Sequence, residues 1–539
     1  MDPEQKPEPE QGQNQEPKQD QKQGPAQSQK PEATGSAAPL SAPIAEQLAA
    51  QLAQFDRDPK AALSTLPPKE DLQNPSQRAA GTAFRADSLS ENAFIDQRDR
   101  YRKLLNTERD GQLIRLGQVQ PGRAPYQQND RVENLVDGSP DELLRTLEAM
   151  EELGLRSARL PESPWSDWYW PIYQGILGAR YNDPGFPLDS EDWKVKRDYV
   201  LARSAPAIVD GGNAEAINRL SPSEKYDQLI GDRDGQLTSA MWEEGERYYD
   251  QQGQVERWMG ICHGWSPAAY MLDRPRHAIE LVAADGKTKL LFYPADLKAL
   301  GSLLWAKASP AVRFIGGRCN DKSPATDENG RVRSALCFDT NPGTFHMALV
   351  NQIGLRKRSF IIDATFDYEV WNQPVHSYSY TYWNPLTRQP AASLAEAKVE
   401  RSALTNDRFA KYRSADARYF VGIGVKLAYV AETVPDDSEE DSAERDALKT
   451  VRYVYDLELD EDGVILGGEW YNNAHPDFLW TPPPAVMAQA TTDYAATGEW
   501  TGGVLPESWR RAAIAAARNG QPLGKLVAAL MKLAAAPGR

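Results

Sequence analysis

Apolar side chains recur at helical spacing near the start of the foldable part of the chain. Ile44, Leu48, Leu52 and Phe55 fall on one helical face, so their spacing predicts an amphipathic helix over residues 44–63. Only one side of such a helix is apolar. It is therefore expected to pack that side against the rest of the protein.

Capping residues indicate where further helices begin. Ser139-Pro140-Asp141-Glu142 combines an N-cap, a proline at the first helical position and acids in the first turn, which predicts a helix ending near Gly154. Ser221-Pro222-Ser223-Glu224 is a capping box that opens another helix. From Asn213 to about Met271 the pattern is mainly helical. Helical spacing returns in two later segments, 296–305 and 506–533.

From Ile279 onward, short apolar runs bounded by turn residues take over. They predict strands over 279–282, 288–293, 345–350, 360–362, 419–433, 452–459 and 464–471. The turn Asp460-Glu461-Asp462-Gly463 predicts that the last two strands form a hairpin. A helical part followed by a strand-rich part indicates the α+β class.

Composition divides the chain into three regions. Residues 1–43 are almost entirely Gln, Glu, Pro, Lys, Asp, Gly, Ser and Ala, with no aromatic residue, so we expect a disordered tail. Residues 44–137 are polar and patchy, which predicts a partly helical, loosely ordered linker. Residues 138–539 hold enough apolar and aromatic residues for a large core, and we expect any catalytic site there.

Charge and hydropathy exclude some partners. The formal net charge is −16 at pH 7, so the chain repels polyanions and nucleic acid is a poor partner. No apolar run approaches the roughly 20 residues that span a bilayer. The N-terminus lacks the basic and apolar regions of a Sec signal peptide, which predicts a protein that is cytoplasmic or exported by another route.

Cys262 is the candidate nucleophile. It follows Gly260-Ile261 and precedes an apolar run, Ala268 to Leu272, that predicts a buried helix. The positive end of a helix dipole favours a thiolate, so the position predicts a lowered thiol pKa. Cysteine catalysis also needs an imidazole beside the sulfur and a group that orients the imidazole.

His346 is the candidate imidazole, because it lies inside the strand-like run Thr344 to Val350. The alternative is a hydrogen-bonded core histidine. Asp363 follows the apolar pair Ile361-Ile362, where a carboxylate must be hydrogen-bonded or paired, and orienting an imidazolium would satisfy it. Asp339 is the rival for this role, although its turn-rich setting favours an Asx-turn.

Two further sets of residues are candidates for a disulfide and a metal site. Cys319 and Cys337 flank a polar loop and form either a disulfide or two unpaired thiols. Asp232, Asp234 and Glu243 have part of the spacing of an EF-hand calcium loop, but the glycine is two positions early. A turn before a helix explains this segment equally well.

Several motifs together resemble the transglutaminase elicitor family of oomycetes and its bacterial relatives, within the papain-like transglutaminase superfamily. They cover about residues 165–484 and are specific as a set: SPSEKYDQLIGD from Ser221, WMGICHGWSPAAYM from Trp258, FYPADLKAL from Phe292, FIGGRCN from Phe314, CFDTNPGTFHMALVNQIG from Cys337, VWNQPVHSY from Val370 and GGEWYNNAHPDFLW from Gly467.

The resemblance implies a papain-like core with the Cys262 helix packed on an antiparallel sheet, extra helices before it, and a Cys262, His346, Asp363 triad. It also implies protein-glutamine γ-glutamyltransferase activity on a glutamine-bearing protein or peptide with an amine or lysine acceptor. Trp258 is the indole expected to help stabilise the oxyanion. The residues require no cofactor, but the oomycete members imply calcium dependence. The long tail and the missing signal peptide depart from the family pattern.

Three functions fit these residues. The first is transfer of a glutamine acyl group to an amine. The second is hydrolysis on the same fold, by an amidase, deamidase or protease, which a Cys–His–Asp triad alone does not distinguish from transfer. The third is a binding protein with a degenerate site.

Overall fold

The computed structural model describes residues 42–58, 130–308, 310–317, 325–328, 339–364, 370–471 and 475–536. All of them belong to one unit, Pro39–Arg539. None of the helices in these ranges has the length and apolarity needed to cross a membrane. Residues 1–41, Cys319 and Cys337 lie outside the described residues, so the predictions of a tail and a disulfide are not addressed.

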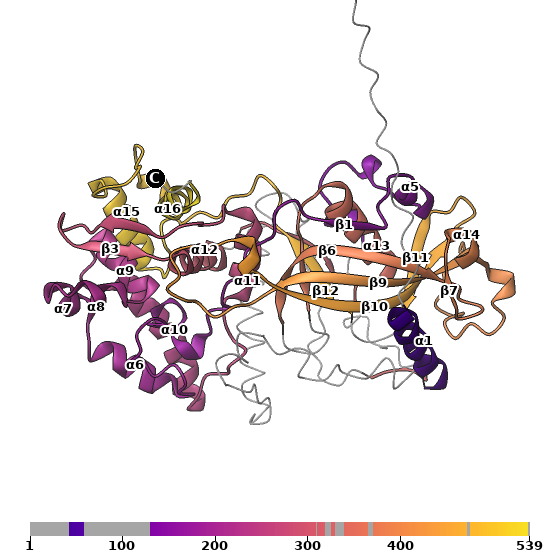
Figure 1. Ribbon diagram of the computed structural model, residues 1–539, viewed down its shortest axis with the longest axis horizontal. Helices are drawn as coiled ribbons and strands as arrows, with labels where there is room; N and C mark the ends of the chain where they lie inside the picture. The colour runs from indigo at the N-terminus through magenta and orange to yellow at the C-terminus, as the bar shows by residue number, and fades with distance from the viewer. Residues whose placement is uncertain are drawn as a thin grey trace, which may run out of the picture. The chain divides into compact units, whose positions relative to one another are not determined.

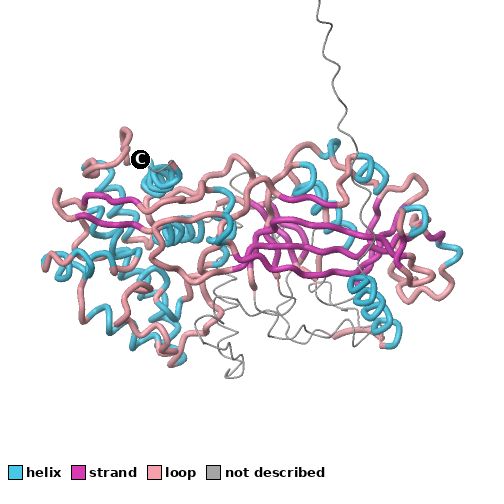
Figure 2. Tube along the Cα trace, in the orientation of Figure 1, coloured by secondary structure: helices cyan, strands magenta, loops and turns pink. Residues whose placement is uncertain are grey.

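The described chain is a mixture of helices and antiparallel strands (Figures 1 and 2). Its α-helices are α1 (Ala42–Arg57), α5 (Leu147–Glu152), α6 (Trp193–Leu201), α7 (Ala205–Asp210), α8 (Ala214–Asn218), α9 (Pro222–Ile230), α10 (Gln236–Gln252), α11 (Cys262–Met271), α12 (Pro294–Ala308), α13 (Pro342–Ala348), α14 (Leu394–Ala397), α15 (Glu507–Ala517) and α16 (Gly524–Ala535).

Its strands are β1 (Ser157–Arg159), β2 (Ile279–Val282), β3 (Lys289–Phe292), β4 (Arg313–Gly316), β5 (Ile361–Asp363), β6 (Asn372–Trp383), β7 (Pro390–Ala391), β8 (Val399–Glu400), β9 (Tyr419–Ala431), β10 (Ala447–Leu459), β11 (Ile465–Trp470) and β12 (Phe478–Thr481).

The large sheet has the antiparallel order β11-β10-β9-β6-β5-β12-β4. The β10–β11 hairpin and the strand at β5 confirm the sequence predictions, and β2 and β3 form a separate antiparallel pair. The central strand β6 was not predicted. Its Asn, Gln, Pro, His and Ser residues hide the apolar alternation that marks a strand.

Capping chemistry sets the start of α9 as the sequence predicts. The Ser221 hydroxyl accepts a hydrogen bond from the Glu224 N–H, and the Glu224 carboxylate accepts one from the Ser221 N–H. The predicted helix over 139–154 is interrupted, because the Leu144 N–H donates to the Asn351 side chain and Thr146 bridges to Val464. The predicted C-terminal helix over 506–533 is likewise two helices, α15 and α16.

The segment with His346 is a helix, and the prediction of a strand over 345–350 is wrong. Asn341 caps α13 by accepting a hydrogen bond from the Gly343 N–H at 2.9 Å, and Pro342 occupies the first helical position. A π-helical segment, Leu349–Leu355, continues it. Every residue of α13 is buried, so no polar face reveals the helical period, and a short apolar run does not separate a strand from a buried helix.

The two faces of the sheet contact different cores. Ile362 and Leu479 lie in the cluster that also contains Phe345 of α13. Ile361 and Trp480, which are neighbours of those residues along β5 and β12, point to the opposite face and pack with Tyr270 of α11. Because successive strand residues alternate between faces, α11 and α13 lie on opposite sides of these strands.

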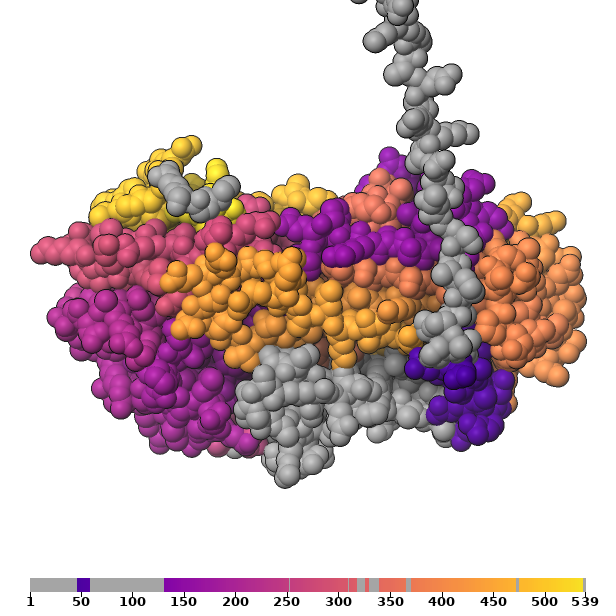
Figure 3. Space-filling view, viewed as in Figure 1, coloured from indigo at the N-terminus to yellow at the C-terminus, as the bar shows by residue number. Residues whose placement is uncertain are grey.

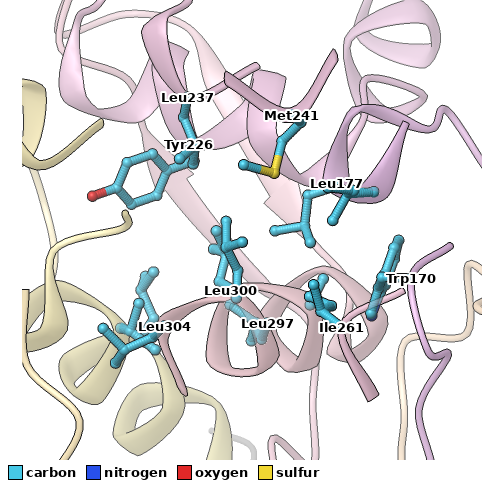
Figure 4. Close-up of a cluster of buried hydrophobic side chains, with 14 of the residues drawn as sticks. Trp170, Leu177, Tyr226, Leu237, Met241, Ile261, Leu297, Leu300 and Leu304 are labelled. Atoms are coloured by element: carbon cyan, nitrogen blue, oxygen red, sulfur yellow. The ribbon is translucent and has the colours of Figure 1, made fainter. Parts of the chain in front are cut away.

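A helical core positions α11. Ile261, the residue before Cys262, belongs to a cluster with Trp170, Leu297 and Leu300, which Figure 4 shows around α12. The four aromatic residues of the segment 165–170 are buried in the same cluster. The start of α11 is therefore fixed by apolar packing.

The amphipathic helix α1 is confirmed, with its apolar face buried as expected. Leu48, Leu52 and Phe55 pack against a cluster that includes Phe409 and Tyr471. Figure 3 shows this helix in indigo against orange residues of the strand-rich part. The predicted linker after it falls mostly outside the described residues.

Gly264→Ala is expected to destabilise the protein by about 1–3 kcal/mol, as overpacking of a core does. A Cβ at Gly264 would lie 2.2 Å from the Ser302 carbonyl oxygen and 2.7 Å from the Ala306 nitrogen, both in the backbone of α12. Chemical denaturation measures the change. Gly424→Ala is the matched control, because its methyl would meet no atom nearer than 3.4 Å. Equal stability of the two variants would contradict this close contact.

Candidate active site

Cys262 is the first residue of α11, as predicted, and its backbone is held from the preceding residues. The Ile261 N–H donates to the Tyr169 carbonyl at 2.7 Å. Gly260 permits this approach, because a Cβ there would lie 2.4 Å from the same oxygen. Cys262 is buried, with 7% of the residue exposed.

The sulfur contacts the start of β6. The Asn372 side-chain amide donates a hydrogen bond to Sγ at 3.5 Å, and the thiol donates to the Val370 carbonyl at 3.7 Å. The Asn372 amide is itself fixed, because its Oδ1 accepts from the Trp480 indole N–H at 2.8 Å. A short chain of side-chain contacts therefore joins Cys262 to β6 and β12.

Asp363 lies at the same end of the sheet. It is the register partner of Asn372 on the neighbouring strand, so both side chains lie on the face that α11 covers. Its Oδ1 accepts a hydrogen bond from the Trp371 N–H at 3.0 Å, and its side chain is fully buried. The structure therefore brings Asp363 into the neighbourhood of Cys262.

The thiol is not activated in this arrangement. The pKa of Cys262 is raised to about 11, chiefly by burial; the hydrogen bonds with Asn372 lower it, and the negative charges of Glu432 and Asp363 raise it. Desolvation and two carboxylates outweigh the field of the helix N-terminus. The prediction that the thiol pKa is lowered is therefore wrong, and the sulfur carries its proton.

His346 does not contact Cys262. Its Nδ1 shares a hydrogen bond with the Tyr455 hydroxyl at 2.8 Å, and its ring packs against Tyr380 with 4.8 Å between ring centroids. Both tyrosines face the α13 core, on the other side of β5 and β6 from α11. Because His346 lies on a helix inside that core, the predicted approach of its ring to the sulfur does not occur in this structure.

The rival carboxylate, Asp339, contacts a different histidine. Its Oδ2 lies 3.6 Å from Nδ1 of His475, whose ring stacks on Trp470. Asp339 therefore does not orient His346 in this structure. Burial lowers the pKa of both His346 and His475 to about 3, so both rings are neutral at neutral pH.

The candidate oxyanion donor and the calcium candidates have other contacts. The Trp258 indole N–H donates to the Glu256 carboxylate. Asp232 accepts hydrogen bonds from the Asp234 and Gln236 N–H groups at 3.2 and 2.9 Å, so it serves the turn before α10.

The calcium candidates do not form a group in the structure. Glu243 is exposed on α10, and no cluster of three or more potential metal ligands occurs among the described residues. The turn interpretation of the segment is confirmed.

Sequence reasoning missed Asn372, which contacts the sulfur, Glu432, whose charge acts on it, and Gln373, which contacts Glu432. Asn372 and Gln373 belong to the VWNQPVHSY motif, and Glu432 ends the apolar run 419–433. For Glu432 a signal was available in the sequence, because a carboxylate at the end of a predicted apolar strand is the pattern that also identified Asp363. Gln373 and Glu432 are joined by a hydrogen bond of 2.6 Å.

The family model that describes the transglutaminase elicitor matches residues 142–497, about two thirds of the chain. The chain belongs to the transglutaminase elicitor family. Its matched region contains Cys262, Asp363, Asn372 and Glu432, so the whole neighbourhood of the thiol lies within the family domain. The α1 helix and the C-terminal helices α15 and α16 lie outside the matched region.

A solved structure also resembles this family member. It is the crystal structure of the GP42 transglutaminase from Phytophthora sojae, with 20% sequence identity over 71% of this chain and 99% of that chain, and a TM-score of 0.43. No curated protein sequence matches the chain.

Proposed function

We propose that this member of the transglutaminase elicitor family is a protein-glutamine γ-glutamyltransferase, with Cys262 as its nucleophile and its chemistry carried by residues 138–539. One observation carries the proposal: the family domain holds a buried thiol at the start of α11, fixed by Asn372 and next to the Asp363 carboxylate. A substrate that brings a glutamine side chain to this sulfur would place an amide carbonyl within reach of a positioned nucleophile.

The reaction has two halves. In the first, the sulfur bonds to the amide carbon, the carbon–nitrogen bond breaks, and ammonia leaves with the proton that the thiol gave up. In the second, an amine attacks the thioester, the carbon–sulfur bond breaks, and the thiol regains a proton. An amine such as a lysine side chain gives an isopeptide bond, whereas water gives glutamate.

The surroundings of the thiol favour the amine over water. Trp258, Trp371 and Tyr169 are buried in the same core as Cys262, and the rings of Tyr169 and Trp371 lie 5.4 Å apart between centroids. Aromatic walls limit the entry of water and protect a thioester from hydrolysis. Asp363 serves as the carboxylate of the site, and the role that the sequence assigns to His346 stays a prediction.

The test is mass spectrometry of a glutamine peptide incubated with the protein and a primary amine, with and without calcium. We expect the peptide to gain the amine and lose ammonia. Loss of ammonia with uptake of water would indicate a deamidase, and cleavage of the peptide backbone would indicate a protease. An unchanged peptide in every condition would contradict an enzymatic function.

A further inference from the structure

The thiol of Cys262 needs a proton acceptor, and the ring of His346 is held by Tyr455 and Tyr380 instead. Two carboxylates act on the thiol electrostatically, Glu432 more strongly than Asp363. Glu432 directly follows β9, and Val430, two residues earlier, packs in the same core as Cys262. The acid is therefore brought to the site by the central part of the sheet.

A fixed neighbour orients Glu432. Its Oε1 accepts a hydrogen bond of 2.6 Å from Gln373 Nε2, and both side chains are 3% exposed. Gln373 is adjacent in sequence to Asn372, the residue that contacts the sulfur. In the antiparallel pairing of β6 and β9, Val375 lies opposite Tyr429, and the same register continued to the strand ends brings Glu432 beside Asn372. The start of β6 therefore contacts the sulfur through Asn372 and the carboxylate through Gln373.

The hydrogen-bonded pair of Gln373 and Glu432 leaves one acceptor atom without a donor among the described residues. Gln373 Oε1 is buried and has no hydrogen-bond donor within the ranges that the structure covers. A buried carbonyl oxygen without a donor is costly, and an N–H group that enters the site would satisfy it. Both the leaving ammonia and an incoming amine carry such N–H groups.

The charges around Glu432 suit proton transfer near neutral pH. Burial raises the pKa of Glu432 to about 7, although the hydrogen bond from Gln373 and the positive charge of Lys449 lower it. The charge of this carboxyl also raises the pKa of Tyr429 on β9 and of Cys262 on α11. An acid with a pKa near the working pH is present in both of its protonation states.

We propose that Glu432 carries the proton between the Cys262 thiol and the nitrogen of the leaving or entering amine, and that Gln373 is its positioning residue. This inference rests on the proposed transferase function and names the acid–base group for it.

The proton balance is complete without another reactant. The S–H proton moves to the Glu432 carboxylate as the sulfur bonds to the amide carbon. The carboxyl then gives this proton to the amide nitrogen as the carbon–nitrogen bond breaks, and ammonia leaves. In the second half the attacking amine gives a proton to Glu432, which returns it to the sulfur as the carbon–sulfur bond breaks.

The experiment compares Glu432→Gln with wild type in amine incorporation and in alkylation of Cys262 by iodoacetamide. Removal of the base is expected to lower kcat by about 10²-fold or more and to abolish the rise of activity through pH 7. Removal of the negative charge is also expected to lower the thiol pKa, so Cys262 should alkylate faster at pH 9. If Glu432 had only a structural role, Glu432→Gln would not combine faster alkylation of Cys262 with a lower kcat.

Two further variants sharpen the comparison. Gln373→Met keeps the side-chain length but loses the hydrogen bond that lowers the pKa of Glu432, so the rise of activity should move to higher pH. Glu439→Gln is the matched control, because it removes an exposed carboxylate from the same segment and should leave kcat and alkylation unchanged.

The outcomes separate this inference from the function on which it rests. Wild-type kcat and pH profile in folded Glu432→Gln, with Cys262→Ala inactive, would overturn the role of Glu432 and leave the transferase standing. If His346→Gln then lost activity in the folded protein, the histidine would be the proton carrier. A wild-type protein that incorporates no amine would overturn both proposals.

Discussion

Cys262→Ala is expected to reduce amine incorporation to the background of the assay, a loss of about 10⁶-fold if it matches other enzymes that lose their nucleophile. A thioester needs a cysteine, and Cys262 is the cysteine within the described residues. The side chain is small and its hydrogen bonds to Asn372 and Val370 are long, so the free energy of unfolding should change by only about 1 kcal/mol.

Ser266→Ala is the matched control for this change. It alters a buried residue of the same helix by a similar volume, and its hydroxyl has no hydrogen-bond partner among the described residues. Its activity should equal that of wild type. Circular dichroism and thermal unfolding report whether each variant is folded. Substantial amine incorporation by a folded Cys262→Ala protein would contradict the proposed function.

His346→Gln is expected to make the protein less sensitive to acid. The folded-state pKa of His346, about 3, lies below its ordinary value of 6.5, so the folded protein binds fewer protons than the unfolded chain between these values. The stability from the neutral ring is fully present above pH 6.5 and is lost as the pH falls. At pH 4.5 the loss is about 3 kcal/mol for this one residue, from about 1.4 kcal/mol per pH unit.

The measurement is the difference in unfolding free energy between variant and wild type at pH 7 and pH 4.5. Carboxyls with raised pKa values, such as Asp167 and Glu432, act in the opposite direction over part of this range, but they are common to both proteins. Glutamine can keep the hydrogen bond to Tyr455. His277→Gln changes a histidine of a connecting segment and serves as the control. A difference that does not vary with pH would contradict the neutral, buried state of His346.

Local signals in the sequence predicted much of the fold. The capping box at Ser221 and the spacing of Leu48, Leu52 and Phe55 depend on near neighbours, and both helices form where predicted. The strand with Asp363 was also predicted, because an apolar run bounded by turns needs no distant partner to be recognised. Cys262 at a helix start followed from the apolar run behind it.

The remaining features depend on tertiary contacts. His346 lies on a helix because α13 is buried on all sides, which removes the periodicity that distinguishes helix from strand. β6 has polar residues that are buried by other segments, so its pattern does not resemble a strand. Asn372 contacts Cys262 only when β6 is placed beside α11. The raised pKa of the thiol follows chiefly from burial in that placement. The family motifs included Asn372 but did not show its contact with the sulfur.

Intact-protein mass spectrometry during turnover tests the central claim most directly, that Cys262 forms a thioester with a glutamine side chain. With a glutamine peptide and no amine, we expect a covalent adduct equal to the peptide less ammonia. It should map to Cys262, be absent from Cys262→Ala, and disappear when an amine is added. An active protein whose adduct maps to another residue, or whose Cys262 never carries the peptide, would contradict the account.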